Sequence, residues 1–85
     1  AWSERADQAM ERAAKLKPED ANVQYGLVCS RARLGRTQEA LAALSRSVDL
    51  GYTDADGTAE DPDLRSLRGL PEFEALLARM RSNAT

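Results

Sequence analysis

The chain has 85 residues, enough for one small domain. Hydrophobic residues make up 42% and charged residues 31%, as in a globular protein rather than a disordered one. The sequence has no histidine, one cysteine and a net charge of −2. These features argue against histidine-based catalysis, an internal disulfide, a cysteine-based zinc site and general nucleic-acid affinity.

The sequence has no apolar run near the ~20 residues that span a membrane and no signal-peptide pattern. A single cysteine fits a reducing compartment, so we expect a cytoplasmic protein without a membrane partner. Ten arginines against two lysines are compatible with a GC-rich bacterial gene. Because the chain begins at Ala1 and not at methionine, we expect an excised fragment or a processed product.

The first predicted helix covers residues 3–17. Ser3 can cap its start, and Pro18 prevents it from continuing. Its apolar residues follow spacings of four, three and three, which place them on one helix face: Ala6, Met10, Ala13 and Leu16.

Residues 20–51 are predicted to form two further helices joined by a short turn at Gly35. Thr37 is predicted to cap the second of them, and Gly51 to end it. A turn this short makes the two helices pack antiparallel. The residues expected on their buried faces are Val23, Leu27, Val28, Ser30, Leu34, Leu41, Leu44 and Val48.

Residues 52–61 are predicted to form an acidic loop, because glycine and threonine are mixed there with aspartate and glutamate. Residues 62–81 are predicted to form a short helix, capped by Asp61 and beginning at Pro62, and then a last helix that begins at Pro71. The sequence therefore indicates an all-α fold of antiparallel helix pairs, with about four main helices and one short helix.

The sequence also matches itself at a fixed period. A shift of 34 residues superimposes the first predicted helix on the third, and a shift of 33 superimposes the third on the last. The matched pairs are small or apolar in both helices: Ala6 and Ala40, Met10 and Leu44, Leu16 and Leu50, Leu44 and Leu77. A shared period of this length indicates a helical repeat.

This period, with its helix–turn–helix units, resembles the tetratricopeptide repeat. The residues that match the signature are Ala6, Met10, Ala13 and Pro18, and then Leu27, Gly35, Ala40 and Leu44. The residues that replace the signature's tryptophan, glycine, tyrosine and proline are Gln24, Val28, Arg31 and Tyr52. The resemblance covers residues 3–50 well and residues 51–81 loosely.

The resemblance implies an α-solenoid fragment, in which the first helix of each pair lines a groove that binds a peptide or protein. It implies that residues 3–17 are the second helix of a unit, residues 20–51 a full unit and residues 62–81 a degenerate capping unit. The chain would then be the C-terminal portion of an array. Its first helix would expose apolar surface, which favours a homodimer.

The candidate partner-binding residues lie on the side of the second helix that faces the groove in the resembled family. They are Asn22, Tyr25, Cys29 and Arg33. Tyrosine and arginine are favoured at interface hot spots, and an asparagine can hydrogen-bond to an extended peptide backbone. A solvated face without a ligand is the alternative at these positions.

No catalytic, metal-binding or cofactor-binding site is predicted. A calcium loop counted from Asp54 fails, because Ala59 and Arg65 occupy the places that require glycine and glutamate. Cys29 has no histidine or adjacent lysine to activate it, which favours a small, partly buried residue.

We therefore expect a non-catalytic protein–protein interaction module that binds a peptide or a protein surface. A structural or oligomerisation segment of a larger protein is the alternative. A helix-turn-helix DNA reader is a third interpretation, since residues 31–41 carry three arginines at the entry to a helix. The acidic stretch that follows and the length of the helix that ends at Leu50 argue against it.

Overall fold

A computed structural model of the chain describes residues 4–84, and this part of the chain is all-α. The predicted fold class is thereby confirmed. The elements are α1 (Glu4–Leu16), α2 (Ala21–Arg33), α3 (Thr37–Asp49), α4 (Ala55–Glu60), the 3-10 helix η1 (Pro62–Leu67) and α5 (Pro71–Asn83).

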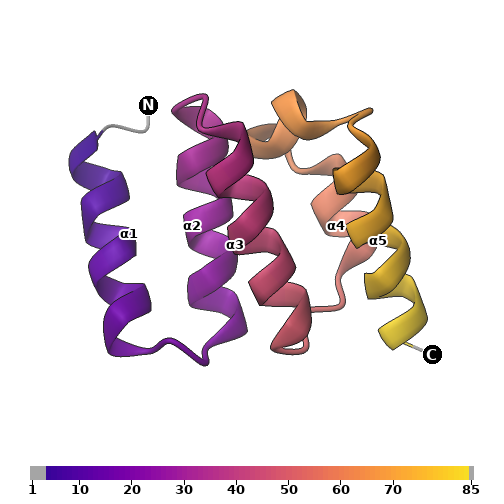
Figure 1. The fold of residues 1–85 in the computed structure, drawn as a ribbon, viewed down its shortest axis with the longest axis horizontal. Helices are drawn as coiled ribbons and strands as arrows, with labels where there is room; N and C mark the ends of the chain where they lie inside the picture. Colours follow the sequence, from indigo (N-terminus) through magenta and orange to yellow (C-terminus); the bar gives the residue numbers. More distant parts are fainter. Residues whose placement is uncertain (1–3, 85) are drawn as a thin grey trace.

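The helices follow one another across the molecule in a stack. α1, α3 and α5 run in the same direction, whereas α2 runs antiparallel to its neighbours α1 and α3 (Figure 1). α2 packs against α1, α3 and η1, and α5 packs against α3 and α4. The three helices that run in one direction are those that the 34- and 33-residue shifts superimpose. The internal similarity of the sequence thus corresponds to parallel helices of the stack, with the antiparallel α2 between α1 and α3.

The ends of α2 and α3 follow from local chemistry. Asp20 caps α2, because its carboxylate accepts two backbone N–H bonds from the first turn at 2.9 and 3.2 Å. Gly35 makes the turn into α3 with φ 78°, a conformation that favours glycine. The prediction that Thr37 caps α3 is wrong: the Arg36 carbonyl already accepts the first helical bond, so Thr37 lies inside the helix. The predicted cap Ser3 lies outside the described residues.

The structure corrects the acidic loop predicted at residues 52–61, because most of that segment forms α4. Asp54 caps the helix by accepting the backbone N–H of Gly57 at 3.0 Å. Thr58 is fully buried and donates its hydroxyl to the Asp54 carbonyl at 2.7 Å. Capping and the burial of small side chains compensate for the low apolar content of this helix.

The C-terminal segment contains both helices predicted in residues 62–81, and α5 continues two residues further, to Asn83. Asp61 caps η1 by accepting the backbone N–H of Asp63 at 2.9 Å. Leu64 and Leu67 project from η1 into the core and are fully buried.

The core is continuous from α2 and α3 to η1 and α5. Most of the residues predicted to be buried are buried: Leu27, Val28, Ser30, Leu41, Leu44 and Val48, with Val23 and Leu34 partly so. Leu16 is an exception, since it is 78% exposed although it was predicted on the apolar face of the first helix.

Candidate functional site

The predicted partner-binding residues lie along the side of α2 that faces the segment 55–67. This segment packs on α2 through η1. Asn22, near the start of α2, and Arg33, at its end, are exposed. Tyr25 is half-buried and Cys29 is buried, so the structure separates the four residues into an exposed pair and a covered pair.

Tyr25 joins α2 to the segment that leads into η1. Its ring stacks on Tyr52 with the ring centroids 4.5 Å apart and the planes 15° from parallel. Its hydroxyl donates a hydrogen bond of 2.7 Å to Oδ2 of Asp61. Burial, and then this bond to a carboxylate, raise the pKa of Tyr25 above its ordinary value, so the hydroxyl keeps its proton.

Cys29 is the least accessible of the four candidate partner-binding residues. The residue is only 7% exposed, and its thiol donates to Oδ2 of Asp61 over 3.7 Å. Burial raises the pKa of Cys29 to about 12, and the nearby carboxylates of Asp61 and Asp63 contribute in the same direction. A thiol held in its protonated form is a poor nucleophile and a poor metal ligand at neutral pH.

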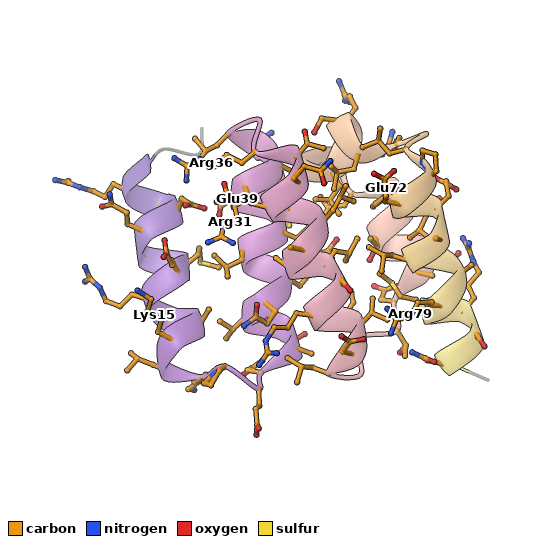
Figure 2. All side chains as sticks on the ribbon, in the orientation of Figure 1. Lys15, Arg31, Arg36, Glu39, Glu72 and Arg79 are labelled. Carbon is orange, nitrogen blue, oxygen red and sulfur yellow. The ribbon has the colours of Figure 1, made fainter. Side chains whose placement is uncertain are left out.

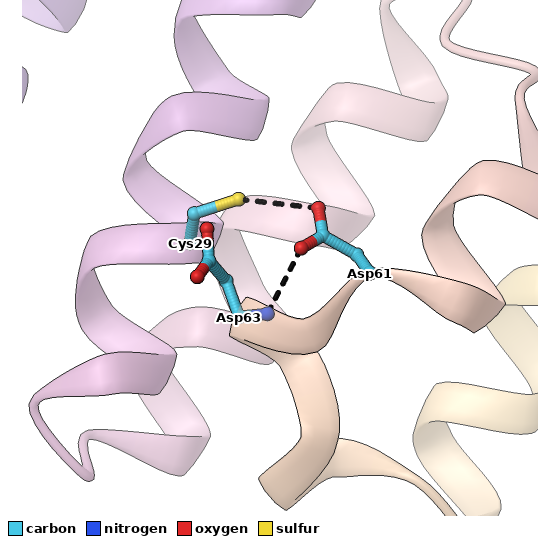
Figure 3. A group of neighbouring side chains, drawn as sticks. All are labelled: Cys29, Asp61 and Asp63. Carbon is cyan, nitrogen blue, oxygen red and sulfur yellow. Dashed lines mark hydrogen bonds between the residues drawn. The ribbon is translucent and has the colours of Figure 1, made fainter.

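Asp61 is the centre of this cluster. Its Oδ2 accepts from the Tyr25 hydroxyl. The same oxygen accepts from the Cys29 thiol, while its Oδ1 accepts the backbone N–H of Asp63 (Figure 3). One ligand atom from each of Cys29, Asp61 and Asp63 lies within 4.8 Å of the others, so these three described residues could together approach a metal ion. An ion there would displace donors that already satisfy Asp61. The arrangement is suited to holding η1 against α2.

Arg33 forms an ion pair with Asp63, with Nε 3.3 Å from Oδ1. The pair borders an open hollow of about 390 Å³ between the end of α2 and η1. The residues that line it are Ala32, Arg33, Pro62, Asp63, Arg65 and Ser66. The hollow extends the exposed part of the predicted surface onto η1, whose residues were not predicted to bind a partner.

A second polar cluster, which was not predicted from the sequence, joins α1 to α2. Asp7 is 1% exposed and accepts a 2.7 Å bond from the Ser30 hydroxyl and a 3.2 Å bond from Nη1 of Arg36. Arg31 approaches the same carboxylate, with Nε 3.7 Å from Oδ1. Figure 2 shows Arg31 and Arg36 between α1 and α2. The sequence feature that pointed to this cluster was Asp7, an aspartate next to the apolar face of the first predicted helix.

Next to this cluster, Met10 of α1 lies over Gly26 of α2. A Cβ atom at Gly26 would overlap the terminal methyl of Met10. The absence of a side chain at this position therefore leaves room for the end of the Met10 side chain between the two helices.

Comparisons with known proteins give a similarity to part of a longer plant protein. No protein-family model matches the sequence, and no solved structure matches it. The chain is 35% identical over 77 residues to a chloroplastic protein of Arabidopsis thaliana. The match covers 84% of this chain and 23% of that protein, so the chain spans about a quarter of the length of its curated relative. No helix within residues 4–84 is long and apolar enough to cross a membrane.

Proposed function

We propose that this chain is a non-catalytic protein–protein interaction module of the tetratricopeptide type. The surface that binds a peptide or protein runs along the exposed margin of α2, from Asn22 to Arg33, and onto η1. The observation that carries the proposal is the open hollow beside Arg33, because it gives this margin a concave, partly charged surface.

Two further observations support the proposal. The internally similar helices α1, α3 and α5 run in the same direction within a stack, and α2 packs antiparallel between α1 and α3, as expected of helical repeats. In the plant relative, the similar segment is one part of a longer protein, as expected for a module.

Selection from a displayed library of random peptides tests this function. We expect peptides that bind the wild-type chain and lose at least tenfold in affinity when Asn22→Ala and Arg33→Ala are combined. The reason is that a few hot-spot residues supply most of the binding free energy of an interface. The matched control combines Gln8→Ala and Arg12→Ala, an exposed amide and an exposed guanidinium on α1. A selection that yields no binders, or binders that respond equally to both double variants, contradicts the proposal.

We propose self-association through α1 as a second candidate function, favoured by the exposure of Leu16. This leucine is 78% exposed, and Ala9 on the same helix is exposed as well. Light scattering over a concentration series should give a mass that rises toward that of a dimer, and Leu16→Asp should return it to the monomer mass. A monomer mass at every concentration contradicts this candidate.

A further inference from the structure

We propose that the hollow between the end of α2 and η1 binds an oxyanion group, either a carboxylate or a phosphate, carried by the partner peptide. The inference rests on the proposed function, since it names the chemistry of the partner at that surface. The donors, the charges and the shape of the hollow support it.

The hollow has the size and character of a site for one polar side chain. Its volume of about 390 Å³ lies at the lower end of the range for ligand pockets. Ala32 and Pro62 provide apolar wall, and polar side chains provide the rest. Pro62, Arg65 and Ser66 are exposed, so a ligand can enter from solvent.

The donors in this hollow outnumber its free acceptors. Asp63 is the one carboxylate in the lining, and it is paired with Arg33 at 3.3 Å. Within residues 4–84, neither the Arg65 guanidinium nor the Ser66 hydroxyl has an ion-pair or side-chain hydrogen-bond partner. A guanidinium provides only donors, in a planar fork that fits two oxygens of a carboxylate or phosphate. The hollow therefore lacks an oxyanion partner for Arg65.

The net charge of the lining agrees with this chemistry. Two arginines and one aspartate give it one net positive charge. The Asp63 carboxylate repels an incoming anion and is already paired with Arg33, so it should weaken anion binding in the hollow. Removing that charge while keeping the side-chain shape should consequently strengthen binding, an effect that a purely structural role of Asp63 would not produce.

A second hollow on α1 provides the comparison. It has a volume of about 230 Å³ and is lined by Gln8, Glu11, Arg12 and Lys15. Its Glu11 approaches Lys15 within 3.9 Å, and all of its walls belong to one helix. Arg12 is thus an exposed arginine at the edge of a hollow, remote from η1, and is the matched control for Arg65.

The test uses three nine-residue peptides of alanine and leucine with blocked ends, which differ only in a central glutamate, phosphoserine or glutamine. Binding to the ¹⁵N-labelled chain is measured from chemical-shift changes. We expect the glutamate or the phosphoserine peptide to shift the amide signals of Arg33, Arg65 and Ser66 and to bind at least fivefold tighter than the glutamine peptide. The tighter of the two anionic peptides identifies the source of the oxyanion.

Variants then assign the binding to the hollow. Arg65→Glu should weaken binding of the anionic peptide at least tenfold, Arg12→Glu less than twofold, and Asp63→Asn should strengthen it at least threefold. Equal binding of the three peptides, no binding of any of them, equal effects of Arg65→Glu and Arg12→Glu, or no gain with Asp63→Asn overturns the inference. Library peptides that depend on Asn22 and Arg33 but not on Arg65 would overturn it while the proposed function stands.

Discussion

Asp7 places a carboxylate in the interior between α1 and α2. Taking a charge out of water is unfavourable unless hydrogen bonds and opposite charges replace the lost solvation. The Ser30 hydroxyl and the Arg36 guanidinium do so at 2.7 and 3.2 Å. Arg31 depends on the same carboxylate, because its buried Nε has no hydrogen-bond partner among the described residues. The cluster therefore stabilises the fold only while all of its members are present.

Asp7→Ala should lower the free energy of unfolding by about 3 kcal/mol, because it leaves the partly buried Arg31 side chain without its main countercharge. Urea unfolding followed by circular dichroism measures the change. Glu11→Ala is the control: this carboxylate, 46% exposed, lies 3.9 Å from Arg31 and should contribute less than about 0.5 kcal/mol. Equal effects of the two variants would contradict the structural role of Asp7.

Cys29 should make the free energy of unfolding depend on pH in the alkaline range. Its pKa rises from an ordinary value of 9.0 to about 12 in the folded chain, chiefly because the thiol is buried. Below pH 9 the thiol is protonated in both the folded and the unfolded chain, and its full contribution to the free energy of unfolding is present. Between pH 9 and about 12 only the folded chain keeps this proton, and the contribution is lost as the pH rises. We expect the urea midpoint to fall above pH 9, and to fall less in Cys29→Ala. Parallel pH curves for the two proteins would contradict this assignment.

At the scale of the element, α4 shows how a short helix forms with little apolar sequence. It has six residues, a capping aspartate and a fully buried threonine. Asp54→Ala should destabilise the chain by about 1 kcal/mol, the usual effect of losing an N-cap. Asp56→Ala should have less than half that effect, since the Asp56 side chain is 92% exposed. Thermal unfolding of both variants measures the difference, and equal melting temperatures would show that the cap is not needed.

The long helices could be predicted from the sequence because their signals are local. Helical spacing of apolar residues, proline at the start of α5 and glycine after α2 fixed these helices to within two or three residues. α4 could not be predicted in the same way, because it packs against α5 and η1 and its polar Thr58 is fully buried. The candidate site was predicted only in part for the same reason. Tyr25 and Cys29 both donate hydrogen bonds to Asp61, which is 36 and 32 residues away along the chain.

At the scale of the whole molecule, one core joins the stack from α2 to α5. Leu44 of α3 is fully buried in it, whereas Leu16 of α1 is 78% exposed. Leu44→Asp should cost several kcal/mol and unfold a domain of this size, because the new charge has no buried partner. Leu16→Asp, the same chemical change, should leave the melting temperature within a few degrees of the wild type. Circular dichroism measures both, and a folded Leu44→Asp variant would contradict the packing.

The contact between α1 and α2 also determines how the two helices are aligned along their axes. Four of the six apolar residues of α1 are alanines, so its apolar face is similar from one turn to the next. A shift of one turn, about 5.4 Å, would therefore change apolar packing little, but it would carry Asp7 away from Ser30 and Arg36 and Met10 away from the gap at Gly26. One buried charge and one missing side chain thus give α1 a single register on α2.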